Sequence, residues 1–150
     1  MTADSDLIKL YSNRILALAA DIPLTDRLAS PQATVKRRAP LCGSTVTVDL
    51  RLADDRITEY GQDVKACALG QASASVVGAN ILGRNRAEIE LARDQLLKML
   101  KEDGPAPDAP FDGLEVLRPA RNYKNRHASI MLALEATLEA FDEARRSDCA

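Results

Sequence analysis

Residues 45–65 restrict the fold more than any other part of the chain, because their pattern is that of a β-hairpin. Apolar and polar side chains alternate over residues 45–52, which is the period of a strand with one buried face. Asp54 and Asp55 then supply turn residues, and the pattern predicts a second strand over 56–64. A small antiparallel sheet is therefore the expected centre of the fold.

The hairpin brings two of the three cysteines to the same end of the sheet. If the two aspartates are the loop residues, the residue numbers of any two paired residues add up to 109. The numbers of Cys42 and Cys67 also add up to 109, so the two lie opposite each other beyond the strands. A register one residue longer pairs Leu50 with Tyr60 and makes Gly61 a candidate bulge. Both registers keep the two thiols close together.

The rest of the chain is predicted to be mostly helical. An amphipathic helix capped near Asp4 opens the chain and ends before Pro23, and an edge strand is expected over 34–39. Further helices are predicted from Cys67 to Gly83, over 87–100 and from Asn125 onward, with a short helix or turn at 114–117. Small side chains between Ala68 and Ala79 indicate close packing of the first of these helices on the sheet.

These elements predict an α+β fold. It has a small, mainly antiparallel sheet of about three strands, with helices packed mostly on one face. A chain of 150 residues is long enough for one core and too short for two ordinary domains, so residues 1–150 are expected to form a single domain.

Composition narrows the classes of function. The net charge is −2 and only 3% of residues are aromatic, which argues against nucleic acid as a partner. The longest apolar stretches, such as residues 15–20, are too short to cross a membrane, and the first residues lack a secretory signal, so we expect a cytoplasmic protein. Three cysteines, of which Cys149 is penultimate, do not suit a disulfide framework.

Cys42, Cys67 and His127 form the candidate metal site. Two thiols at one end of a hairpin and an imidazole in the first turn of a helix are ligand types suited to zinc or iron–sulfur chemistry. Cys67 begins a helix, where free N–H groups and the helix dipole favour the thiolate. The alternative is that both cysteines are small buried hydrophobic residues and His127 an ordinary polar residue.

Three segments resemble the signature motifs of the U-type iron–sulfur cluster assembly scaffolds, the family of IscU, SufU and the NifU N-terminal domain. The segments are Pro40-Leu41-Cys42-Gly43, the run ACALGQASAS over 66–75, and Arg126-His127-Ala128-Ser129. The resemblance extends over nearly the whole chain, and the proline-containing segment before the last helix is similar to the SufU-type branch. It implies the same α+β fold.

Two positions depart from the family pattern. Ser44 stands where the family has aspartate, and the third motif contains no cysteine. Alignment on the SufU-type pattern puts Ser129 at the missing position, whereas alignment on the IscU-type pattern puts Ala128 there and makes His127 a metal ligand. In either alignment the family positions offer fewer than the four ligands that a cluster or a closed zinc site usually has. The site would therefore be open to water, to a ligand from a partner or to an exogenous thiol.

The resemblance implies a scaffold without enzymatic activity, monomeric or weakly self-associating, that holds a transient iron–sulfur cluster or zinc at Cys42, Cys67 and His127. A cysteine desulfurase and other iron–sulfur assembly factors are the implied partners. Two alternatives stay open. One is an interaction module that kept the fold and lost metal binding, and the other is a zinc-dependent sulfur-transfer accessory with Cys42 as the sulfur carrier.

Basic residues near the predicted site form a further candidate surface. It consists of Lys36, Arg37, Arg38, Arg118, Arg121, Lys124 and Arg126. We interpret it either as a docking surface for an acidic partner or as an ordinary solvated face.

Overall fold

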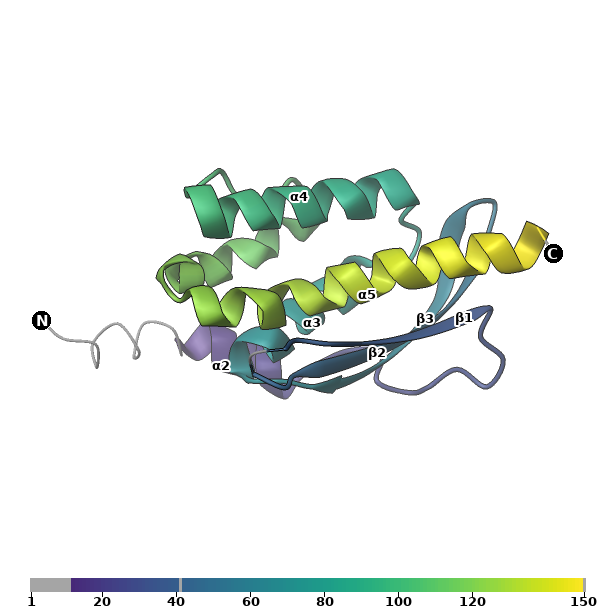
Figure 1. The fold of residues 1–150 in the computed structure, drawn as a ribbon, viewed down its shortest axis with the longest axis horizontal. Helices are drawn as coiled ribbons and strands as arrows, with labels where there is room; N and C mark the ends of the chain where they lie inside the picture. Colours follow the sequence, from purple (N-terminus) through teal and green to yellow (C-terminus); the bar gives the residue numbers. More distant parts are fainter. Residues whose placement is uncertain (1–11, 41, 150) are drawn as a thin grey trace, which may run out of the picture.

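The computed structural model describes residues 12–40 and 42–149, with the side chains of 148 and 149 outside that description. Within these residues, the strands β1 (Ala33–Arg38), β2 (Thr45–Ala53) and β3 (Arg56–Lys65) form one antiparallel sheet in the order β1-β2-β3 (Figure 1). The predicted edge strand is β1, and the predicted hairpin is β2 and β3.

The hairpin contains both of the predicted registers. Asp54 and Asp55 both have positive φ, 51° and 61°, as a tight two-residue hairpin turn requires. Pairs next to the turn sum to 109, and pairs from Arg51 and Glu59 onward sum to 110. The extra residue is Thr58, so the bulge is not at Gly61.

Gly61 is needed for another reason, because a Cβ there would lie 2.5 Å from the backbone oxygen of Asp26.

The helices are α2 (Asn13–Ala20), α3 (Ala68–Asn80), α4 (Arg86–Glu102) and α5 (Lys124–Cys149), and a 3-10 helix, η1 (Phe111–Asn122), precedes α5. Ser12 caps α2, whereas the cap predicted near Asp4 lies outside the described residues. The predicted short helix at 114–117 is part of the longer η1. None of the described helices combines the length and apolar character needed to cross a bilayer.

Helix α5 is the centre of the packing. It lies along one face of the sheet and separates β1 and β2 from α4 (Figure 1). Residues 130–134 of α5 are all buried, so this helix contacts neighbours on nearly every side. The predicted packing of α3 on the sheet is limited to β3, where Gln62 Nε2 donates to the carbonyl of Ala74 at 3.2 Å, and α3 packs chiefly between α2 and α5.

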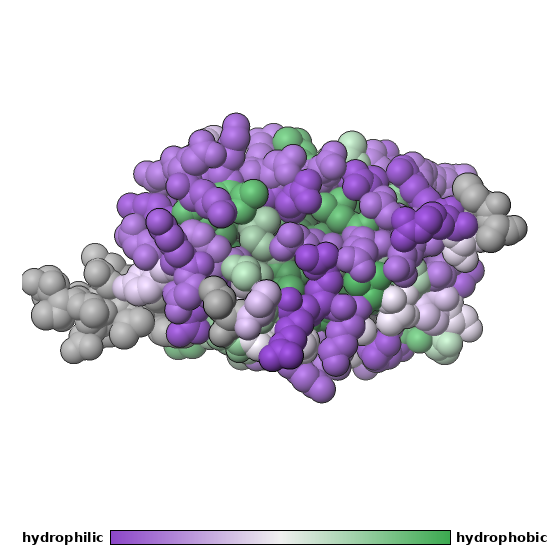
Figure 2. Space-filling view, in the orientation of Figure 1, coloured by the Kyte–Doolittle hydropathy of each residue, from purple (hydrophilic) through white to green (hydrophobic). Residues whose placement is uncertain are grey.

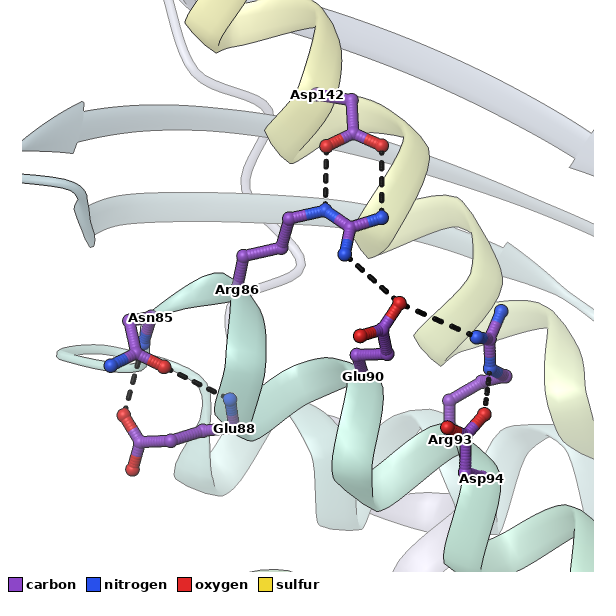
Figure 3. Close-up of polar contacts among 7 residues, drawn as sticks. All are labelled: Asn85, Arg86, Glu88, Glu90, Arg93, Asp94 and Asp142. Carbon is purple, nitrogen blue, oxygen red and sulfur yellow. Dashed lines mark hydrogen bonds and ion pairs between the residues drawn. The ribbon is translucent and has the colours of Figure 1, made fainter.

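A cluster of ion pairs joins α4 to α5. Arg86 donates two hydrogen bonds to Asp142, at 2.7 and 3.2 Å, and a third to Glu90 at 3.0 Å (Figure 3). Asn85 and Glu88 form a capping box that fixes the start of α4. Because Arg86 begins α4 and Asp142 lies late in α5, the two helices run antiparallel.

The second face of the sheet is also covered, by residues 21–32. The alternating pattern predicted one buried face for β2, yet Thr47 and Asp49 on the other face are buried as well. Asp49 is fully buried and accepts hydrogen bonds from Arg27 Nε at 2.5 Å, Thr34 Oγ1 at 2.6 Å and the backbone N–H of Leu28 at 3.2 Å. Burial alone would raise the pKa of the Asp49 carboxyl, but these hydrogen bonds outweigh it and hold the pKa below its ordinary value.

We predict that Asp49→Asn destabilises the protein by about 2–3 kcal/mol at pH 7, because the amide cannot replace the charged acceptor of Arg27. Since the pKa of Asp49 is lowered in the folded state, its contribution is complete above the ordinary pKa of 3.8 and is lost as the pH falls through the folded-state pKa. Urea unfolding of wild type and variant at a series of pH values measures the difference, which should shrink below pH 3.8.

The matched control is Asp54→Asn at the exposed hairpin turn, where Asn tolerates the positive φ. It should change stability by less than about 0.5 kcal/mol. A difference between wild type and Asp49→Asn that stays constant down to pH 3 would contradict the assigned role of the carboxylate.

Candidate metal centre

The two sheet connections place Cys42 and Cys67 at one end of the sheet, as predicted. Cys42 lies in the turn between β1 and β2, where Gly43 has a φ of 73° and donates a hydrogen bond to the carbonyl of Ala39 at 3.0 Å. Cys67 follows the last residue of β3, Lys65, by two positions, and Lys65 pairs with the first residue of β2. The two thiols line one open cleft of about 320 Å³.

Two serine hydroxyls connect the thiols. Cys42 Sγ lies 3.2 Å from Ser44 Oγ, Ser129 Oγ donates to Ser44 Oγ at 3.0 Å, and Cys67 Sγ lies 3.5 Å from Ser129 Oγ. Ser44 and Ser129 are buried, whereas Cys42 is exposed and Cys67 is partly buried. Ser44, which departs from the family pattern, therefore contacts Ser129, one of the two residues considered for the position of the missing cysteine.

Cys67 is the N-cap of α3, as the sequence predicted. Burial would raise the pKa of its thiol, but the N–H groups of Gly70 and Leu69, the Ser129 hydroxyl and the Arg126 guanidinium favour the thiolate and lower the pKa. The pKa of the Cys42 thiol is also lowered. There too burial opposes the shift, and hydrogen bonds from Ser44 and Ser129 and the charge of Arg126 favour the thiolate.

Positive charge surrounds the cleft. Lys65 and Arg126 line it, the described lining residues include no acidic one, and the guanidinium of Arg38 reaches Gly43. Within the described part of the chain none of these three cations has an ion-pair partner. The wider basic surface predicted from sequence is partly neutralised, since Arg37 pairs with Glu139 and both Arg118 and Arg121 pair with Asp103.

His127 does not join the thiols. Its Nε2 contacts the carbonyl oxygens of Ala120 and Arg121, both at 3.1 Å, and the ring is buried against a separate cavity between α4 and α5. Ala128 lines the same cavity. The structure thus brings Cys42 and Cys67 together with Ser129, and places both His127 and Ala128 elsewhere, which favours the alignment of Ser129 with the missing cysteine.

The donor set is smaller than a closed metal site requires. Among the described residues, no three His, Cys, Asp or Glu side chains are grouped to hold a metal ion. Two thiols and two neutral hydroxyls do not complete the four ligands of a closed zinc site or a cluster. The residues present fit an open site that receives its remaining ligands from outside the chain.

Comparison with known families gives a match that covers both the sheet and the candidate site. The family model for the NifU-like N-terminal domain matches residues 19–129, which include both cysteines and Ser129. The chain belongs to the NifU-like N-terminal domain family. Comparison with the curated proteins gives no match.

Solved structures agree with this assignment. The N-terminal part of a nitrogen-fixing NifU-like protein from Brucella abortus is 40% identical, with a TM-score of 0.90 over 94% of this chain and 98% of that one. A putative scaffold protein of the SUF system from Fervidobacterium islandicum is 19% identical, with a TM-score of 0.79 over 89% of this chain and 98% of that one, which shows a shared fold. The predicted α+β fold and family are therefore confirmed.

The bridging role of the two serines was not predicted from the sequence, although the signal was present. Ser44 was recognised as a departure from the family pattern, and Ser129 was one of the two residues considered for the position of the missing cysteine. The sequence analysis of this NifU-like domain also did not predict that Arg126 favours both thiolates.

We predict that Arg126→Gln slows alkylation of Cys42 and Cys67 by iodoacetamide at pH 7 by about two- to threefold, because removal of the guanidinium lowers the fraction of thiolate. Peptide mass spectrometry measures the rate at each cysteine separately. Arg14→Gln, on the exposed surface of α2, is the matched control and should leave both rates unchanged. Equal rates in wild type and Arg126→Gln would exclude an electrostatic role for Arg126.

Proposed function

We propose that this NifU-like domain is an iron–sulfur cluster assembly protein that accepts sulfur and metal at Cys42 and Cys67. The placement of the two thiols in one cleft, with lowered pKa values and a shared pair of hydroxyls, is the observation that carries the proposal. Family membership supports it, and so does the neighbour from Fervidobacterium islandicum, which is described as a putative iron–sulfur cluster assembly scaffold protein.

Cys42 is the proposed sulfur acceptor because it is the exposed thiol. Its thiolate attacks the terminal sulfur of the persulfide on a cysteine desulfurase, the S–S bond of that persulfide breaks, and the desulfurase cysteine leaves as a thiolate. Cys42 then carries the persulfide. Cys67, which is less exposed, is placed to share the cargo, and a zinc-dependent sulfur-transfer accessory would use the same step.

The cargo of iron, cluster or zinc is held by the two thiolates, and its remaining ligands come from a partner or an exogenous thiol. Ser44 and Ser129 are poor replacements for an ionised ligand, because a serine hydroxyl does not readily lose its proton. The metal-ligand role that the resemblance implies for His127 stays a prediction, and it requires the ring to leave the carbonyl oxygens that Nε2 now contacts.

Anaerobic reconstitution tests the proposal. Wild type and Cys67→Ala are supplied with iron, sulfide and a desulfurase, and bound metal and visible absorption are measured. We expect wild type to take up metal in less than stoichiometric amounts and the variant to lose that uptake, because a single thiolate is a weak site. Wild type that binds neither iron nor zinc above Cys67→Ala would refute the proposal.

A second candidate function is an interaction module that binds assembly factors without metal. The small donor set of the described residues favours it. Retention of a desulfurase by a double variant of Cys42 and Cys67, combined with no metal uptake by wild type, is the result that would select this function.

We predict that Ser129→Cys raises the affinity for Zn²⁺ by about 100-fold, because a third thiolate then lies beside Cys67. Competition with a chromophoric chelator measures the affinity. Serine and cysteine are nearly equal in shape, so the variant should keep the fold.

Ala128→Cys is the matched control, since it adds a thiol one residue away that faces the cavity between α4 and α5. Its affinity for Zn²⁺ should equal that of wild type. A gain in Ala128→Cys without a gain in Ser129→Cys would show that Ala128 occupies the position of the missing cysteine.

A further inference from the structure

A second cavity lies on the other side of α5 from the thiols. It has a volume of about 750 Å³, within the range of small-molecule sites, and is formed by α4, the end of η1 and the first three turns of α5. Figure 2 shows hydrophobic surface between α4 and α5, bordered by hydrophilic side chains on both helices. We call it the α4–α5 cavity.

The floor of the α4–α5 cavity is apolar and one of its ends is cationic. Leu97, Leu100, Ala128 and Met131 supply the apolar surface. Because α4 and α5 are antiparallel, the last turn of α4 lies beside the first turn of α5, and this brings Lys101, Arg121, Lys124 and His127 to the same end. The positive end of the α5 dipole adds to their charge.

Two of these cations are available to a ligand. Lys101 and Lys124 have no ion-pair partner within residues 12–40 and 42–149, whereas Arg121 lies 3.6 Å from Asp103. His127 is 93% buried, and its Nε2 hydrogen is directed to two carbonyl oxygens, which leaves Nδ1 as the ring nitrogen without a hydrogen-bond partner in the described structure.

The opposite end of the cavity differs in charge. Arg93 is neutralised there by Asp94 at 2.7 Å, and Glu135 adds a negative charge. His127 and Glu135 are eight residues apart on one helix, which corresponds to about 12 Å. A ligand that fills the cavity is therefore expected to have its negative charge at one end only.

We propose that the α4–α5 cavity binds an organic anion with an apolar body, whose carboxylate, phosphate or sulfonate group contacts Lys101 and Lys124 beside His127. The proposal is independent of the function proposed for the thiols, because no residue that the structure describes lines both the cavity and the cleft. A small molecule is favoured over an acidic peptide, because the apolar floor lies between two helices and the cationic groups gather at one end.

Fluorescence titration with 8-anilino-1-naphthalenesulfonate, an apolar aromatic anion, tests the proposal. The double variant Lys101→Gln/Lys124→Gln should bind this probe about tenfold more weakly than wild type, because two charge-assisted contacts are lost. N-phenyl-1-naphthylamine, which has a similar apolar body and no charge, should bind wild type and variant equally. Decanoate should displace the anionic probe from wild type.

The matched control is Lys36→Gln/Lys98→Gln, which removes the same charge from two exposed lysines outside the cavity. It should bind the anionic probe within about twofold of wild type. Equal weakening in both double variants would show a general charge effect, and the proposal would be wrong. Displacement of the probe by an acidic peptide but not by decanoate would also overturn it, in favour of a peptide-docking groove.

The NMR signals of the His127 ring give a second measurement, which shows where on the protein the probe binds. His127 is the only histidine in the chain, so its ring resonances are assigned without mutation. Saturation with the anionic probe should shift them in wild type and in Lys36→Gln/Lys98→Gln. Unchanged His127 resonances at saturation would place the probe elsewhere on the protein and refute the proposal.

Discussion

The close contact between α3 and α5 at Gly70 determines the geometry of the candidate metal centre. A Cβ at this position would lie 2.5 Å from Ser129 Oγ, so only a residue without a side chain allows the two helices to approach this closely. One turn later Ser73 Oγ donates to the carbonyl of Ile130 at 2.7 Å and holds the helices at that separation. Cys67 at the start of α3 is thereby fixed against the first turns of α5. A glycine that takes no part in the chemistry thus decides which residue of α5 the thiol contacts.

The cysteine pair was predictable because strand pairing is a local rule. The alternation along β2 and the two turn aspartates allowed only two registers, and both of them put Cys42 and Cys67 at the same end. The lowered pKa of Cys67 was predictable for a similar reason, since the start of a helix supplies free N–H groups whatever the helix packs against. Neither inference needed knowledge of the tertiary packing.

The placements of His127 and Asp49 could not be predicted from such local rules. Successive residues of a helix point about 100° apart, so positions 127 and 129 face nearly opposite directions and cannot both reach one cleft. The pattern of α5 could not tell which of them does, because five consecutive residues after Ser129 are buried and the helix has no single apolar face. The burial of Asp49 depends on Arg27, 22 residues earlier in an irregular segment with no periodic signal.

If Ser129 occupies the position of the missing cysteine, as the geometry favours, the two serines change the electrostatics of the cleft as well as its ligand count. A carboxylate and a third thiolate would add two negative charges that attract a bare metal cation, whereas Ser44 and Ser129 are neutral. Lys65, Arg126 and Arg38 remain near the two thiolates without acidic partners among the described residues. Such a cleft attracts anions more strongly than cations. Under the function proposed above, metal that arrives with its own anionic ligands, on a thiol or on an acidic partner segment, would therefore be favoured over the free ion, because the same positive charges that weaken capture of the ion attract those ligands.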